Sequence, residues 1–245
     1  MLLRPLLPAA FALAGVVMGV MPLRAAPSLQ ALQDALNSSS AEALTAVLEP
    51  GKGLDPGEVA RRRLLLREQF PDASWTVQPG TPLKDGRTTT QINVIGSREE
   101  GPYRFRFEAQ QQLVLGANGN RFNSQEVIRE TSFLRSGEDN LKVSLLIPDA
   151  VLTGQRYDID VVFDEPLDGA VVAGALQPVT AGELLRMRTP DLQLEALGGG
   201  GLFKSVQAPF QPGSQTWAVL LVHPKGIVTA TKRVRVVADQ GELNP

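Results

Sequence analysis

The single histidine of the chain, His223, is the first residue to weigh as a catalyst. An imidazole is the side chain whose ordinary pKa lies closest to neutrality, so it readily transfers protons. His223 precedes Pro224-Lys225-Gly226, an order of residues that favours a turn between two strands. A general base also needs an orienting partner and a substrate group within reach, and a lone histidine supplies neither. We therefore predict that His223 lies at a hairpin and is not catalytic.

Other candidates for site chemistry also have simpler structural explanations. The chain has no cysteine, which excludes disulfides, thiolate nucleophiles and thiolate–zinc sites. Asp158, Asp160 and Asp164 are acidic, but calcium sites usually gather ligands on a loop, so we expect a solvated strand face. The four glycines at 198–201 lack the Lys-Ser/Thr of a phosphate-binding loop, so we expect a hairpin loop. The sequence therefore predicts no metal, no cofactor and no catalytic residue.

Basic residues cluster in one predicted helix, as Arg61, Arg62, Arg63 and Arg67. Such a face can meet anionic lipid or a phosphate group. We favour a solvated face that is balanced by Glu58 and Glu68. The formal net charge of the whole chain is −2, which argues against nucleic acid as a partner.

The N-terminal segment has the organisation of a secretory signal. Arg4 is followed by an uncharged, mostly apolar run over residues 5–23, and then by Ala25 and Ala26. We predict a signal peptide over residues 1–25 and a periplasmic or secreted product. Because the apolar run approaches the ~20 residues that span a bilayer, a retained membrane anchor is an alternative. The thylakoid lumen is a second alternative location.

Three helices are predicted between residues 28 and 70. Ser28 can cap the first and Ser40 the second. Asp55 can cap the third, because Pro56 suits the first helical position and Glu58 follows three residues after the cap. This third helix is expected to end at Phe70-Pro71.

Strands are predicted from residue 72 to 135. In YRFRFEAQQQLVL, apolar and polar residues alternate from Tyr103 to Leu115, which is typical of a strand with one buried face. The next strand, over residues 121–135, shifts its apolar face between Val127 and Ile128, which predicts a bulge. A polar stretch at 136–140 is the predicted domain boundary, and short strands with Pro/Gly turns fill residues 141–238.

These elements resemble two known folds. Residues 28–135 resemble the nuclear transport factor 2-like family, in which helices pack on a curved antiparallel sheet. The resemblance rests on the helix ending at Phe70, the strand of Trp75 and the strand pair 103–115 and 121–135. Residues 141–238 resemble an immunoglobulin-like sandwich, and the combination resembles exported cyanobacterial proteins. The predicted fold class is an α+β cone plus an all-β sandwich.

The resemblance implies a pocket in the cone, whose candidate lining residues are Trp75, Tyr103, Phe105 and Phe107. The alternative is that these aromatic residues fill the core. Enzymes of this family use an Asp/His pair, and residues 28–135 contain no histidine. A carboxylate with a tyrosine is another catalytic set. However, Glu108 and Glu126 are both expected on strand faces, and alternation places Glu108 on the face opposite Tyr103, so this catalytic set is incomplete.

The function favoured by the sequence is a non-enzymatic, exported binding or interaction protein of the cell envelope. Its partner is expected to be a protein or a small ligand, with no nucleic acid. Membrane contact is expected only through an uncleaved N-terminal segment. One alternative is a lyase- or isomerase-like enzyme with a carboxylate in the cone pocket. Another is a structural accessory of a membrane complex.

Overall fold

The computed structural model describes residues 26–40, 42–137, 141–180, 182–183, 192–198 and 200–245. The predicted signal or anchor at 1–25, the boundary residues 138–140 and Gly199 of the glycine run lie outside these ranges. Among the described residues, no helix combines the length and the apolar character needed to span a membrane.

Three helices form where the sequence predicts them. The first, α1, covers Leu29–Asn37, and the Ser28 Oγ accepts a hydrogen bond from the Ala31 N–H. The second, α2, covers Glu42–Val47. The third, α3, covers Pro56–Gln69, and its cap Asp55 accepts hydrogen bonds from the N–H groups of the first turn. The predicted caps Ser28 and Asp55 are therefore confirmed.

Twelve strands follow within the described part of the chain. They are β1 (Ser74–Pro79), β2 (Thr90–Glu100), β3 (Tyr103–Asn118), β4 (Arg121–Gly137), β5 (Val143–Leu146), β6 (Ala150–Leu152), β7 (Arg156–Phe163), β8 (Ala173–Val179), β9 (Glu195–Ala196), β10 (Gly201–Gln207), β11 (Gly213–His223) and β12 (Gly226–Val237). A short 3-10 helix, η1, covers Gln240–Glu242.

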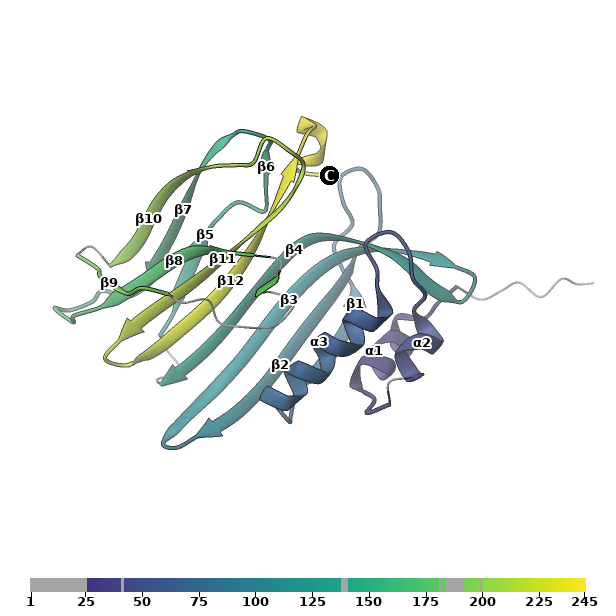
Figure 1. Cartoon of the computed structure of the whole chain (residues 1–245), viewed down its shortest axis with the longest axis horizontal. Coiled ribbons are helices and arrows are strands. Elements are labelled where there is room, and N and C mark those ends of the chain that lie inside the picture. The colour runs from purple at the N-terminus through teal and green to yellow at the C-terminus, as the bar shows by residue number, and fades with distance from the viewer. Residues whose placement is uncertain (1–25, 41, 138–140, 181, 184–191, 199) are drawn as a thin grey trace, which may run out of the picture.

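Nine of the strands form one sheet, in the order β1-β2-β3-β4-β12-β11-β8-β9, with β6 beside β12 (Figure 1). The long hairpin of β3 and β4 is irregular at the predicted position: Gln112 pairs with Arg129 and Leu113 with Val127, so Ile128 has no partner on β3. The predicted bulge is therefore confirmed. It adds local twist to the sheet at this point.

The predicted α+β cone is wrong. Strand β4 continues to Gly137 and pairs with β12 from Gly226↔Gly137 to Lys232↔Thr131, so the sheet passes directly into the C-terminal half. The described protein is mainly β, with only three short α-helices and one 3-10 turn. The physical reason is that β4 is a long strand whose outer edge needs hydrogen-bond partners, and the C-terminal strand β12 provides them.

In the C-terminal half, a three-stranded sheet of order β10-β7-β5 faces the large sheet. A second hydrophobic cluster lies between these layers and includes Tyr157, Ile159, Val161, Trp217 and Val219. A separate cluster lies under the helices and includes Leu44, Phe70 and Trp75. The two hydrophobic clusters are separate, but both pack against the same large sheet. The division into domains at 28–135 and 141–238 therefore stays a prediction.

Helix α1 covers the outer edge of the large sheet (Figure 1). The Asn37 side chain donates to the Trp75 carbonyl (2.7 Å) and accepts from the Trp75 N–H (3.0 Å). The Gln33 side chain accepts from the Val77 N–H (2.8 Å). These two side chains occupy the backbone groups that β1 would otherwise present to another strand.

The core between the two sheets contains a chain of hydrogen bonds. The Trp217 Nε1 donates to the Tyr157 hydroxyl (2.9 Å), which donates to the Gln215 Oε1 (2.8 Å). Burial raises the pKa of Tyr157, so its hydroxyl stays protonated.

The Tyr157→Phe substitution leaves the buried Trp217 N–H without an acceptor. We expect it to lower the free energy of unfolding by about 1–3 kcal/mol, measured by urea denaturation.

The matched control is Tyr103→Phe, because Tyr103 is 60% exposed. This variant should unfold within about 0.5 kcal/mol of the parent protein. Equal losses in the two variants would contradict a stabilising role for the buried hydrogen-bond chain.

Candidate ligand cavity

A cavity of about 350 Å³ lies between the helices and the face of the large sheet that they cover. Helices α1 and α3 cover this face at its N-terminal strands, and the same face continues across β4, β12 and β11. Alternate residues of β3 line the cavity, from Phe107 through Ala109 and Gln111 to Leu113. Ala109 has the smallest side chain of this row.

Most of the cavity wall is apolar. The helical side contributes leucine and valine side chains, and the strands contribute aromatic and branched residues. These residues are Leu32, Leu36, Leu48, Leu54, Val59, Leu66, Trp75, Ile92, Val94, Phe107, Leu113 and Leu115. Such a wall favours the burial of an apolar molecule of moderate size.

The opposite end of the cavity is polar and is formed by β4, β12 and β11. The Gln111 Nε2 donates to the Glu130 Oε1 (2.7 Å), and the hydroxyl oxygens of Ser132 and Thr231 lie 2.6 Å apart. The hydroxyl-bearing Thr216, from β11, also lines this end. A molecule in the cavity therefore meets an apolar wall on one side and hydrogen-bonding groups on the other.

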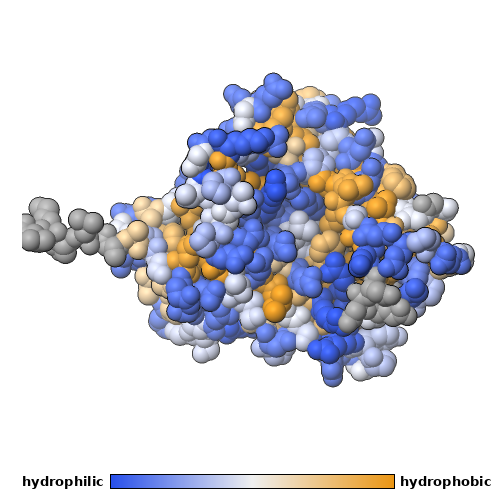
Figure 2. Space-filling view, turned by 180° about the vertical axis from the view of Figure 1, so that it is seen from behind, coloured by the Kyte–Doolittle hydropathy of each residue, from blue (hydrophilic) through white to orange (hydrophobic). Residues whose placement is uncertain are grey.

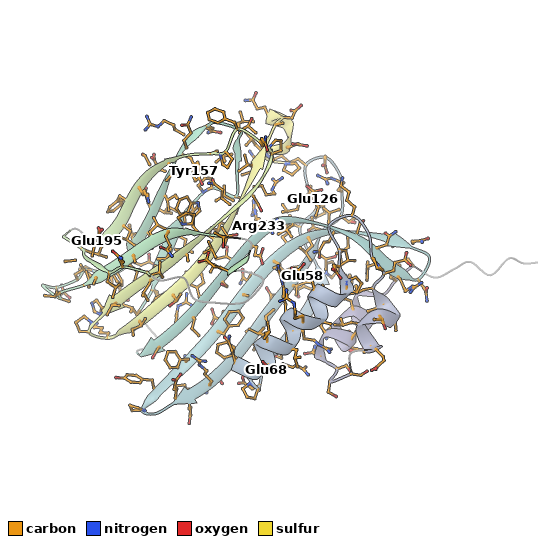
Figure 3. All side chains as sticks on the ribbon, viewed as in Figure 1. Glu58, Glu68, Glu126, Tyr157, Glu195 and Arg233 are labelled. Carbon is orange, nitrogen blue, oxygen red and sulfur yellow. The ribbon has the colours of Figure 1, made fainter. Side chains whose placement is uncertain are left out.

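Arg233 is the cation at this polar end. Its Nη1 lies 3.6 Å from the Glu130 Oε2, which is an ion pair without a hydrogen bond. Within the described structure, its buried Nε has no hydrogen-bond acceptor. Figure 3 shows Arg233 in the middle of the molecule, between the C-terminal strands and the end of α3 that carries Glu58. Its guanidinium therefore has donor capacity that the protein does not use.

A wider hollow of about 690 Å³ adjoins the cavity and shares Leu54, Val59, Arg62, Glu130 and Arg233 with it. Two of its carboxylates, Glu58 and Glu126, are paired with arginines. Glu58 forms an ion pair with Arg62, and Glu126 pairs with Arg87 (2.6 Å) and more distantly with Arg235 (4.0 Å). We call this hollow the mouth of the cavity.

Arg63 connects α3, which covers the cavity, to the end of α1 and the segment after it. It is 8% exposed, and its guanidinium donates to the carbonyl groups of Ala35 (2.9 Å), Ser38 (2.9 Å) and Ser40 (3.0 Å). Burial lowers the pKa of Arg63, and the nearby charge of Arg67 lowers it further. The predicted solvated basic face is therefore wrong for Arg63, which is buried between α3 and the C-terminal end of α1.

Two of the four aromatic candidates line the cavity. Trp75 and Phe107 are part of its wall, and the Phe107 ring stacks on Phe70 at 5.2 Å. Tyr103 is exposed at the start of β3, and Phe105 lies under the Arg98 guanidinium, 5.0 Å from it. Neither of these two residues lines the cavity.

The other predicted candidates lie elsewhere. His223 ends β11 beside the turn to β12, and its Nδ1 accepts from the Lys225 N–H (3.1 Å). Asp158 binds the Ser205 hydroxyl on an exposed strand face. Glu108 pairs with Arg135 (3.1 Å). Among the residues the structure describes, no three His, Cys, Asp or Glu side chains group as metal ligands.

The sequence analysis missed the polar end of the cavity. Arg233, Thr231 and Thr216 come from strands that were assigned to a separate sandwich. A signal does exist: in GIVTATKRVRVV, Thr229, Thr231 and Arg233 alternate with buried residues on β12. This pattern indicates a strand with one polar face, although it does not say which residues that face meets.

A second hollow lies on the opposite face of the large sheet. Figure 2 shows it from behind as a hydrophilic depression near the centre of the molecule. It has a volume of about 500 Å³ and is lined by glutamines, Arg129, Lys232 and Asp149. Arg129 (2.8 Å) and Lys232 already contact Asp149. This hollow lacks the apolar wall of the cavity under α3, which is therefore the stronger candidate site.

Comparison with known families finds one match. Residues 138–237 match the family described as a domain of unknown function (DUF8623). This range contains β11 and β12, which form part of the polar end of the cavity, and it excludes the helices. Comparison with curated proteins gives no match.

The packing of α3 against α1, above the cavity, should depend on Arg63. The Arg63→Met substitution removes three hydrogen bonds to backbone carbonyls and leaves those carbonyls buried. We expect it to lower the free energy of unfolding by about 3 kcal/mol, measured by urea denaturation.

Arg62→Met is the matched control from the next position of α3, since Arg62 forms an exposed pair with Glu58. It should cost no more than about 0.5 kcal/mol. If Arg63→Met were equally mild, the guanidinium would not hold α3 to α1.

Proposed function

We propose that this protein is a non-enzymatic binding protein that holds a small, mostly apolar molecule in the cavity under α3. The observation that carries the proposal is the cavity itself, with an apolar wall and one polar end. Its volume of about 350 Å³ lies within the range of ~300–1,000 Å³ that is usual for small-molecule sites.

The lining favours binding over catalysis. The carboxylate of the cavity wall belongs to Glu130, whose two oxygens face Gln111 and Arg233. A general base needs a free carboxylate oxygen that reaches the substrate, often with a second group to orient or share the proton. The two tyrosines of the chain lie elsewhere: Tyr103 is exposed, and Tyr157 is buried between the sheets. This arrangement gives the isomerase-like alternative little support.

The proposed setting is the cell envelope. Its support is the N-terminal sequence, where Arg4, the apolar run over residues 5–23 and the small residues Ala25 and Ala26 follow the order of an export signal. A binding protein in that compartment would hold apolar molecules that are poorly soluble in water.

The test uses the uncharged fluorescent probe N-phenylnaphthylamine and the Ala109→Leu variant. We expect the parent protein to bind the probe in a saturable way, with a change in the emission of Trp75. Ala109→Leu places a larger side chain on the wall of the cavity and reduces its volume, so it should weaken binding by at least about tenfold, which corresponds to 1.4 kcal/mol. Circular dichroism checks that the variant is folded.

Ala117→Leu is the control, because Ala117 is exposed on the same strand and does not line the cavity. It should bind the probe like the parent protein. The Trp75→Phe variant, in which only Trp217 remains, identifies the source of the signal. A parent protein that does not bind the probe would refute the proposed function.

A further inference from the structure

We infer that the molecule held in the cavity is uncharged and bears a carbonyl or hydroxyl oxygen that accepts a hydrogen bond from Arg233. This inference rests on the proposed function and adds the chemical class of the ligand. It follows from the unused donors of Arg233, the charge balance of the polar end and the apolar wall opposite.

The first step concerns hydrogen-bond donors. Arg233 lines both the cavity and its mouth, so its guanidinium lies where a bound molecule would meet it. Its Nε is buried without an acceptor in the described structure, and its contact with Glu130 is 3.6 Å long. The side chain is nevertheless 32% exposed, so its Nη groups can be reached from the cavity. A ligand oxygen can accept a hydrogen bond from these groups, whereas a pure hydrocarbon cannot.

The second step concerns charge. The polar end holds one cation and one anion, Arg233 and Glu130, and these balance each other. Arg62 lines the same wall but is paired with Glu58. Arg63 also lines the cavity, but its guanidinium donates to the carbonyl groups of Ala35 and Ser38 at the end of α1 and of Ser40 just after it, so it is directed away from the polar end. The polar end therefore has no unbalanced charge for a ligand ion to neutralise.

The third step compares the three kinds of ligand end. A carboxylate would compete with Glu130 for Arg233 and would lie close to another negative charge. An ammonium group would lie close to Arg233. Either ion would also lose its hydration, which costs several kcal/mol unless a partner replaces the water. A neutral oxygen accepts from Arg233 and leaves its ion pair with Glu130 intact.

The experiment compares three probes that share one apolar chain and differ at the polar end: methyl decanoate, decanoate and decyltrimethylammonium. Each is titrated at neutral pH, below its micelle concentration, against the full chain loaded with N-phenylnaphthylamine. Displacement of the dye gives the dissociation constant. We expect methyl decanoate to bind at least about tenfold more tightly than either ion, a difference of 1.4 kcal/mol.

Two variants test the origin of this preference. Glu130→Gln removes the negative charge and leaves Arg233 unbalanced, so decanoate should gain at least tenfold relative to methyl decanoate. Glu108→Gln is the matched control. It removes a carboxylate that is also paired with an arginine, Arg135, but that lies on the opposite face of the sheet. It should leave the preference of the parent protein unchanged.

The outcomes separate the two proposals. Tighter binding of methyl decanoate, with the shift in Glu130→Gln alone, supports an uncharged ligand. Equal or tighter binding of either ion by the parent protein overturns this inference and leaves the cavity as a binding site. Absence of binding for the dye and all three probes refutes the proposed function itself. The comparison of probes on the parent protein holds even if Glu130→Gln does not fold.

Discussion

The pairing of β4 with β12 is the interaction on which the rest of the structure depends. It joins residues that are roughly a hundred positions apart in the chain and turns two groups of strands into one sheet. Without it, β4 would present a long unpaired edge to solvent, which is a hazard for any β protein. With it, the face that the helices cover extends into the C-terminal half. The two hydrophobic clusters lie against the same sheet.

The cavity is a consequence of that continuity. Helices α1 and α3 cover only part of the sheet face, and they bring leucines to Trp75 and the apolar residues of β2 and β3. Strands β4 and β12 then supply Ser132, Thr231 and Arg233 at the other end. The N-terminal half provides the apolar wall and only part of the polar end, which Thr216, Thr231 and Arg233 of the C-terminal half complete. A site with this composition therefore forms only when the β4–β12 ladder is in place.

Local structure could be predicted from the sequence, and long-range pairing could not. Caps such as Asp55 and the alternation from Tyr103 to Leu115 depend on neighbouring residues, and the bulge at Ile128 follows from a shift within one strand. The cone was wrong because its last strand was assumed to end the sheet. The choice of β12 as the partner of β4 depends on contacts between distant segments, which a single sequence does not indicate.

The same limit explains which site residues were found. Trp75 and Phe107 were predicted because the resemblance to a cone fold implied a pocket lined by aromatic residues of its strands. The face alone does not separate them from Phe105, whose ring is covered by Arg98. Arg233 was missed because its importance arises from its place beside Glu130 on a strand from the other half of the chain. Buried Arg63 was misjudged because its acceptors are backbone carbonyls, which have no sequence signature.

The contact of Asn37 and Gln33 with the edge strand β1 gives α1 a second role. These two amide side chains act as a surrogate strand, so the helix that supports the hydrophobic wall also shields the sheet from self-association. Detachment of α1 would open the apolar interior and expose a template for intermolecular cross-β growth at the same moment. Solubility and the integrity of the hydrophobic compartment are thus linked through one nine-residue helix.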